Sequence, residues 1–98
     1  MEIQNTITEE KLKKYFEVTG KALKKLKLSA PSKTHLDNVA KDYLDMAQRY
    51  YDDAKHFQEK GDHINAFAAL NYSHGWLDAG ARLGIFNVDH DSVLFTVD

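Results

Sequence analysis

The amino-acid sequence predicts an all-α fold, an antiparallel up-and-down three-helix bundle that ends in an extended C-terminal tail. Apolar residues recur at three- and four-residue spacings through three long segments. Pro31, Gly61 and Gly84 stand where these segments end. The chain has 98 residues, which is the size of one domain with its own core. We therefore expect a single helical domain over residues 1–98.

The first helix is predicted over residues 9–27. Thr6 and Glu9 have the spacing of a capping box, and an acidic first turn suits the helix dipole. Apolar side chains share one face, with the lysines mainly opposite: Leu12, Tyr15, Phe16, Val18, Ala22, Leu23 and Leu26. Pro31 disfavours helix at the residue before it, so residues 27–32 are predicted to form a linker.

The second helix is predicted over residues 35–60, with Thr34 and Asp37 as its N-terminal cap. Its apolar seam recurs by threes and fours over three heptads: Leu36, Ala40, Tyr43, Ala47, Tyr50, Ala54 and Phe57. Gly61 suits the residue after a helix, and Asp62 can cap the next one. This tight turn predicts that the second and third helices are antiparallel neighbours.

The third helix is predicted over residues 63–83 and is unusually rich in alanine and glycine. One face carries Ala69, Tyr72, Trp76, Gly80 and Leu83, and the opposite face carries Phe67, Leu70, His74, Leu77 and Ala81. A helix that is apolar on two sides needs cover on both. The first two helices can cover one side, so the other side is expected to meet the tail or a second chain.

The tail, residues 85–98, is predicted to be non-helical. Val93, Phe95 and Val97 alternate with other residues, which is typical of a short strand. A lone strand has no sheet to join within a helical chain. We therefore expect the tail to pack as an extended arm or to pair with a second copy.

Composition excludes several classes of function. There is no cysteine, which rules out disulfides and thiolate metal sites. No apolar run approaches the ~18 residues that cross a membrane, and no signal pattern opens the chain, so we expect a cytoplasmic protein with no membrane partner. The net charge of −2 argues against general affinity for nucleic acid.

Charge is nevertheless unevenly distributed along the chain. Residues 9–27 hold seven lysines against three glutamates, whereas the rest of the chain is acidic. The lysine face offers weak support for binding nucleic acid through Lys13, Lys14, Lys21 and Lys24. No aromatic residue is interleaved on that face and no glycine-rich phosphate loop is present, so a solvated helix face is the favoured interpretation.

Two groups of side chains are candidates for a site. A polar network on the third helix combines Asn71, His74, Asp78 and Arg82, which favours helix pinning or an interface over acid–base catalysis. A possible pocket edge combines Asp53, Tyr72 and Trp76. The Asp/His pairs 52/56 and 74/78 fall several turns apart in the predicted hairpin, so neither a metal site nor a cofactor is predicted.

Arg49 and His56 have an Arg-x6-His spacing that resembles the ribonuclease signature of the HEPN family of small helical domains. That resemblance implies a phosphate contact for Arg49 and action on a 2′-hydroxyl for His56. The residue after the arginine is typically polar in that family, whereas Tyr50 here belongs to the apolar seam.

A longer resemblance covers residues 35–88 closely and the first helix loosely. It is carried by YYDDAKHF at 50–57, GD at 61–62, AFAA at 66–69 and YSHGWLDAGARLG at 72–84. These segments resemble the small archaeal domain-of-unknown-function family three-five-seven. The resemblance implies a compact three-helix bundle and an archaeal cytoplasmic protein, and it implies no activity, cofactor or catalytic residues.

These observations favour a non-enzymatic protein-interaction or self-assembly module, with a second copy (a homodimer) or another protein as partner. The reason is the second apolar face of the third helix together with the tail. Two alternatives remain open. One is a HEPN-like RNA- or nucleotide-processing module, and the other is a bundle that binds a small ligand near His74, Asp78 and Arg82.

Overall fold

The computed structural model describes residues 6–95, and within this range the chain is a bundle of three α-helices. The helices are α1 (Glu9–Lys25), α2 (His35–Glu59) and α3 (His63–Leu83). Two short strands, β1 (Lys27–Leu28) and β2 (Phe86–Asn87), follow α1 and α3. The predicted all-α three-helix fold is confirmed, and each predicted helix ends within two residues of the observed one.

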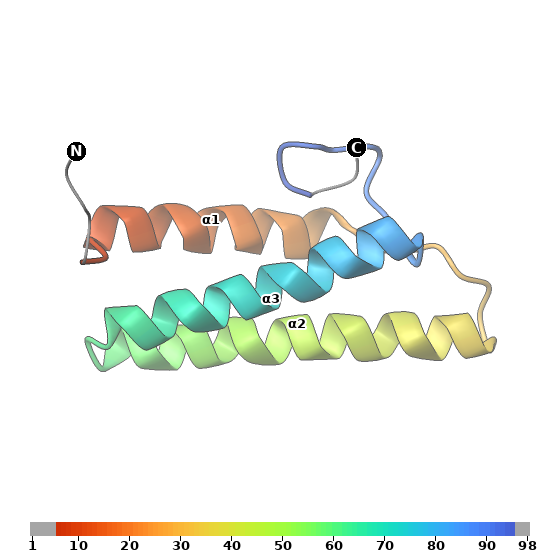
Figure 1. The fold of residues 1–98 in the computed structure, drawn as a ribbon. Helices are drawn as coiled ribbons and strands as arrows, with labels where there is room; N and C mark the ends of the chain where they lie inside the picture. The colour runs from red at the N-terminus through yellow and green to blue at the C-terminus, as the bar shows by residue number, and fades with distance from the viewer. Residues whose placement is uncertain (1–5, 96–98) are drawn as a thin grey trace.

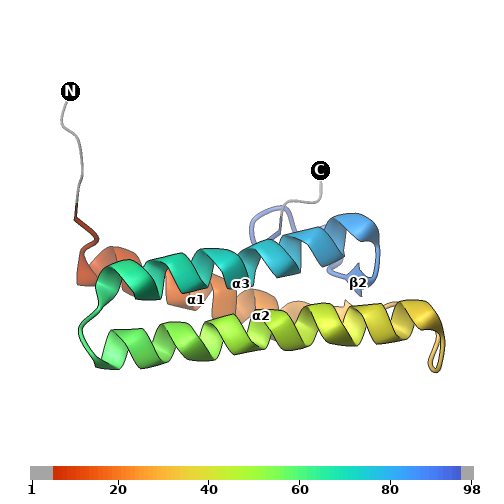
Figure 2. The same cartoon turned by 60° about the horizontal axis from the view of Figure 1, so that its bottom comes forward.

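The central element of the bundle is α3. Figure 1 shows α3 between α1 and α2, and its most extensive packing is against α2. Figure 2 shows α2 and α3 side by side with α1 behind them. One face of the α2–α3 pair is therefore covered by α1, whereas the opposite face meets no other helix or strand of the described residues.

Local side chains set the helix ends. Thr34 caps α2 by accepting a hydrogen bond from the backbone N–H of Asp37 at 3.2 Å, as its spacing predicted. The cap of α1 differs from the prediction, because Thr8 rather than Thr6 accepts from the N–H of Lys11. Only Thr8 immediately precedes Glu9, the first helical residue, so its oxygen can reach a free N–H of the first turn.

The turn between α2 and α3 is as tight as the sequence predicts. Gly61 adopts φ +77°, a left-handed conformation that glycine takes without steric cost. The N–H of Asp62 returns to the carbonyl oxygen of Phe57 at 2.9 Å, and the Asp62 carboxylate then caps α3 through Asn65. These bonds close the hairpin and set the two helices antiparallel.

Small side chains hold α2 and α3 close together. Ala40, Ala47 and Ala54 recur every seven residues along α2 and are fully buried. The buried residues of α3 are also small or medium-sized: Ala66, Ala69, Leu70, Ser73, Leu77 and Gly80. Ser73 is fully buried and its hydroxyl donates to the Ala47 carbonyl oxygen at 2.7 Å. The seam is therefore closely packed and its one buried hydroxyl is satisfied.

The strand in the tail differs from the prediction in its position and its partner. The strand is Phe86–Asn87, and it pairs antiparallel with β1 in the linker, with Leu28 opposite Phe86. From the sequence, residues 27–32 are predicted to be a linker, so no sheet partner for the tail is predicted. Residues 93–95, where alternating apolar residues predict a strand, do not form one, and Val97 lies outside the described residues.

The tail returns to the bundle and completes the core. Ile85, Phe86, Val88 and Phe95 are all buried in one cluster with residues of α1, α2 and α3. Lys25 of α1 lies 3.6 Å from the Asp91 carboxylate, and the N–H groups of Val93 and Leu94 donate to that carboxylate. The described part of the tail is thus an ordered arm on the C-terminal end of α1, and Figure 1 shows its loop there.

Three aspartates make stability depend on pH. The pKa values of Asp37, Asp62 and Asp91 are lowered chiefly by hydrogen bonds from Lys41, Asn65 and the Leu94 backbone N–H, respectively. Because the folded-state pKa lies below the unfolded one, the stabilisation is present above about pH 4 and is lost as the pH falls through the folded values. Urea titrations between pH 6 and 2.5 should show this decline, and it should be shallower when all three are changed to asparagine. An equally steep decline in that variant would contradict the assignment.

Among the described residues, no helix combines the length and the apolar character that a membrane crossing needs.

Candidate functional site

One candidate site is an open groove on the solvent-exposed side of α3, and two of its residues, Asn71 and Gly75, also line a groove between α1 and α3. The volume of the open groove is about 570 Å³. It is lined by one residue of α2 and six of α3: Tyr43, Ala68, Asn71, Tyr72, Gly75, Trp76 and Ala79. None of these lining residues carries a charge. We call this the α3 groove.

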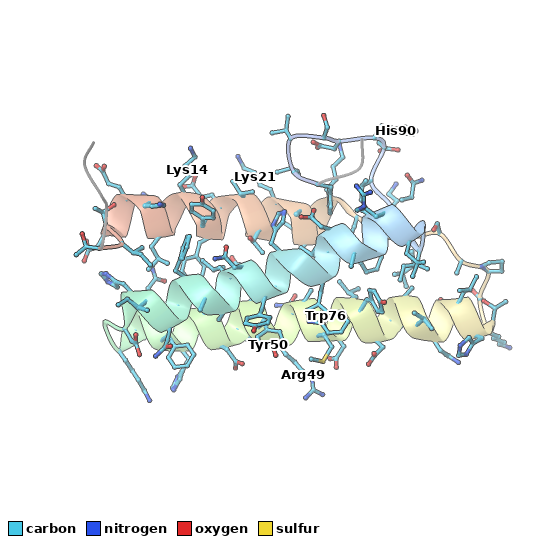
Figure 3. All side chains as sticks on the ribbon, in the orientation of Figure 1. Lys14, Lys21, Arg49, Tyr50, Trp76 and His90 are labelled. Carbon is cyan, nitrogen blue, oxygen red and sulfur yellow. The ribbon has the colours of Figure 1, made fainter. Side chains whose placement is uncertain are left out.

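Aromatic pairs form the wall of the α3 groove toward α2. Tyr43 meets Trp76 edge to face, with ring centroids 5.0 Å apart. Tyr50, which is not itself a lining residue, stacks on Tyr72 with ring centroids 5.2 Å apart, and Figure 3 shows Tyr50 and Trp76 where α3 passes α2. Both geometries are favourable for aromatic pairs, so the wall is held in place before anything binds.

The floor of the α3 groove is made of small residues. Ala68, Gly75 and Ala79 are exposed, and a Cβ added at Gly75 would meet nothing within 4 Å. Larger apolar side chains continue the same stripe at both ends of α3, because Ile64 is 68% and Leu83 58% exposed. Such a surface can accept a ridge of apolar side chains, and its lining residues include no carboxylate, histidine or lysine.

His74 belongs to a different arrangement, on the side of α3 that faces α1 and the tail. Its Nε2 lies 2.7 Å from the Leu94 carbonyl oxygen, and its Nδ1 lies 3.1 Å from the Thr19 hydroxyl. A carbonyl only accepts, so Nε2–H donates, and in the neutral ring Nδ1 accepts from Thr19. Asp78 lies 3.6 Å from Nε2. With both ring nitrogens bonded, His74 ties the tail to α1 and α3.

The predicted network of four polar residues is brought together in part. Asn71, His74 and Asp78 line a second groove of about 260 Å³ between α1 and α3, whereas Arg82 is not among its lining residues. Thr19, which the sequence analysis missed, is 2% exposed and completes the contacts of His74. Its only sequence signal is a threonine inside the apolar face of the first helix.

The predicted pocket edge is divided in a similar way. Tyr72 and Trp76 line the α3 groove, whereas Asp53 is exposed and is not among the lining residues. The groove residues that the sequence analysis did not single out are Tyr43, Ala68, Gly75 and Ala79. Three of these, at positions 68, 75 and 79, can be recognised in the sequence as small residues on the same helical face as Tyr72.

The HEPN-like pair lies on α2. Arg49 is ion-paired with Asp45 at 2.8 Å, and Figure 3 shows it pointing away from the bundle. His56 is exposed two turns further along, roughly 10 Å away along the helix axis. Neither side chain lines the α3 groove or the groove between α1 and α3.

The remaining charged groups are distributed over the surface. Lys13, Lys14, Lys21 and Lys24 are exposed on α1, and Figure 3 shows Lys14 and Lys21 on its outer side. Within residues 6–95, no three histidine, aspartate or glutamate side chains are grouped so that they could share a metal ion.

Comparison with known proteins gives one match. The model of a family described as "Protein of unknown function (DUF357)" matches residues 14–86, a range that includes α1 from residue 14 onward, the whole of α2 and α3, and the start of β2. All residues of the α3 groove lie within it. No curated protein and no solved structure matches the chain.

Proposed function

The chain belongs to the DUF357 family of proteins of unknown function, and from that premise we propose that it is a non-enzymatic interaction module that docks a protein partner on the α3 groove. The observation that carries the proposal is the combination of an uncharged apolar groove with exposed apolar residues beyond both of its ends. Tyr72 is 63% exposed in its centre.

The exposed residues of this stripe contribute little to the fold. Ile64, Tyr72 and Leu83 have more than half of their surface in water, so they bury little apolar area in the free chain. Scattered exposed apolar residues are ordinary, but a contiguous stripe is typical of a protein-binding surface. A central tyrosine and tryptophan are also the residues that most often dominate binding energy at interfaces.

The partner's contact surface is expected to be apolar and helical. The groove floor consists of Ala68, Gly75 and Ala79 at spacings of seven and four residues, which lets another backbone approach α3 closely. The absence of charge among the lining residues disfavours a phosphate-bearing or strongly acidic partner at this site.

A photo-reactive p-benzoylphenylalanine at position 72 tests the proposal in cells that express the chain. We expect a discrete protein adduct, identified by mass spectrometry, that disappears when Ala79→Glu places a charge on the groove floor. The matched control carries the same residue at position 49, on the outer side of α2, and should give no such adduct. Equal labelling at both positions, or an adduct unaffected by Ala79→Glu, would refute docking on the groove.

A further inference from the structure

We propose that the occupant of the α3 groove is a second copy of this chain, packed so that the two α3 helices run antiparallel about a two-fold axis at their midpoint. This inference rests on the proposed interaction role and names its partner. Three features of the described residues carry it: the side-chain sizes along α3, the charge of its exposed side and the area that is available.

Side-chain size is the first feature. An antiparallel copy centred between residues 73 and 74 places 64 opposite 83, 68 opposite 79 and 72 opposite 75. Any helical stripe has positions that map in this way, but here the residue types also match. Ile64 meets Leu83, Ala68 meets Ala79, and the projecting Tyr72 meets Gly75, which has open space above its Cα. The large Tyr72 side chain thus faces a gap, the two large aliphatic residues at the helix ends face each other, and the small alanines face each other.

Charge is the second feature. In an isologous interface the same surface patch of both copies is in contact. Charged residues of one sign at its centre would therefore repel each other. None of the described residues that line the groove is charged. Arg82 is exposed near one end of α3, and the same operation places it opposite Asn65, not opposite another cation. The face is therefore compatible with a copy of itself.

Area is the third feature. The 21 residues of α3 span about 31 Å, and two helices side by side make a face about 20 Å wide. The contact of α3 with the second α3 takes about half of that face, roughly 300 Å², so it forms the centre of an interface that reaches the ~800 Å² per partner of a standard one only where α2 and flanking side chains also contact the second copy. A short peptide or a small ligand would leave both apolar ends exposed, whereas a second α3 covers the whole length.

The described tail does not compete for this face. Its buried residues share a core cluster with Ala22 of α1 and Leu77 of α3, and His74 holds Leu94 on that side. Tyr43 and Trp76 of the groove are partly buried against the same cluster. The face that carries the α3 groove stays open when the arm is in place, and the tail packs on one side of α3 while a second copy packs on the other.

Because the chain has no cysteine, single introduced cysteines report the geometry directly. We would mix Ala68→Cys protein with Ala79→Cys protein under mild oxidation and compare the mixture with each variant alone. In the proposed arrangement 68 lies opposite 79, whereas 68 lies about 16 Å along the axis from its own copy. We expect disulfide-linked dimers in the mixture and their loss in either variant alone. A mixture of Lys14→Cys and Lys21→Cys, both exposed on the outer side of α1, is the matched control and should not cross-link.

Three results would overturn either the proposed antiparallel arrangement or the second copy itself. Cross-linking of either single variant as strongly as the mixture would show another arrangement. Cross-linking of the control pair would show random collision. A lack of cross-linking, with sedimentation velocity showing only monomer, would exclude self-association. The photo-adduct at position 72 separates this failure from that of the proposed function. If position 72 forms an adduct with a different protein, the groove is still a docking site but its partner is not a second copy. If position 72 forms no specific adduct, the proposed docking function is also wrong.

Discussion

Replacing Phe95 by alanine is expected to lower the free energy of unfolding by about 3–5 kcal/mol. Phe95 is 2% exposed and packs in the same cluster as Ala22, Leu26 and Leu77, so its removal leaves a cavity between α1, α3 and the tail. Native domains of this size have about 5–15 kcal/mol of stability in total. The loss should therefore be plain in urea or thermal unfolding followed by circular dichroism.

Val93 supplies the matched control for Phe95. It lies two residues earlier in the same arm and is 89% exposed, so Val93→Ala should change stability by less than about 0.5 kcal/mol. A similar small effect for Phe95→Ala would mean that the arm is not part of the core. It would also mean that the tail is not held against the α1 side of the bundle, so that it would be free to cover the α3 groove.

The second large effect is expected at Gly80. A Cβ added there would overlap the ring of Phe86, which the strand pairing of β2 with β1 holds against α3. Overpacking a closed site costs about 1–3 kcal/mol. Alanine favours a helix interior over glycine by about 1 kcal/mol, so the net loss for Gly80→Ala should be about 0–2 kcal/mol, with the upper end expected because the ring of Phe86 closes the site.

Gly75 is the control for Gly80 in the same helix. Nothing lies within 4 Å of a Cβ added at Gly75, so Gly75→Ala should raise the free energy of unfolding by about 0.5–1 kcal/mol. In a Phe86→Leu background, which shrinks the side chain above Gly80, Gly80→Ala should lose most of its cost. Equal effects at the two glycines in chemical denaturation would show that Phe86 does not pack on Gly80.

The sequence predicted the three helices because each carries a sustained apolar period and clear end signals. Thr34, Gly61 and Gly84 act by local chemistry, and local chemistry can be read from sequence. The sheet could not be predicted in the same way. Its strands are two residues each and lie at opposite ends of a helical chain, so only their packing together makes them recognisable.

The site was partly predictable for a related reason. A second apolar side of α3 follows from its composition, and Tyr72 and Trp76 follow from helical period. The contribution of Tyr43 and the alignment of His74 with Thr19 and Leu94 depend on how the elements pack. The tail was expected to be one possible cover for the second apolar side, but Phe95 and Leu94 place it on the side of α1. That placement leaves the α3 groove open.

The most direct test of a self-associating α3 face is a charge exchange followed by sedimentation velocity. Ala68→Glu alone and Ala79→Lys alone each bury an unpaired charge against an alanine of the other copy and should give monomers. The double variant places each glutamate opposite a lysine of the other copy and should sediment as a dimer again, because the two positions are too far apart along one helix to pair within a chain. A double variant that stays monomeric while the wild-type chain dimerises, or a wild-type chain that never dimerises, would contradict the account.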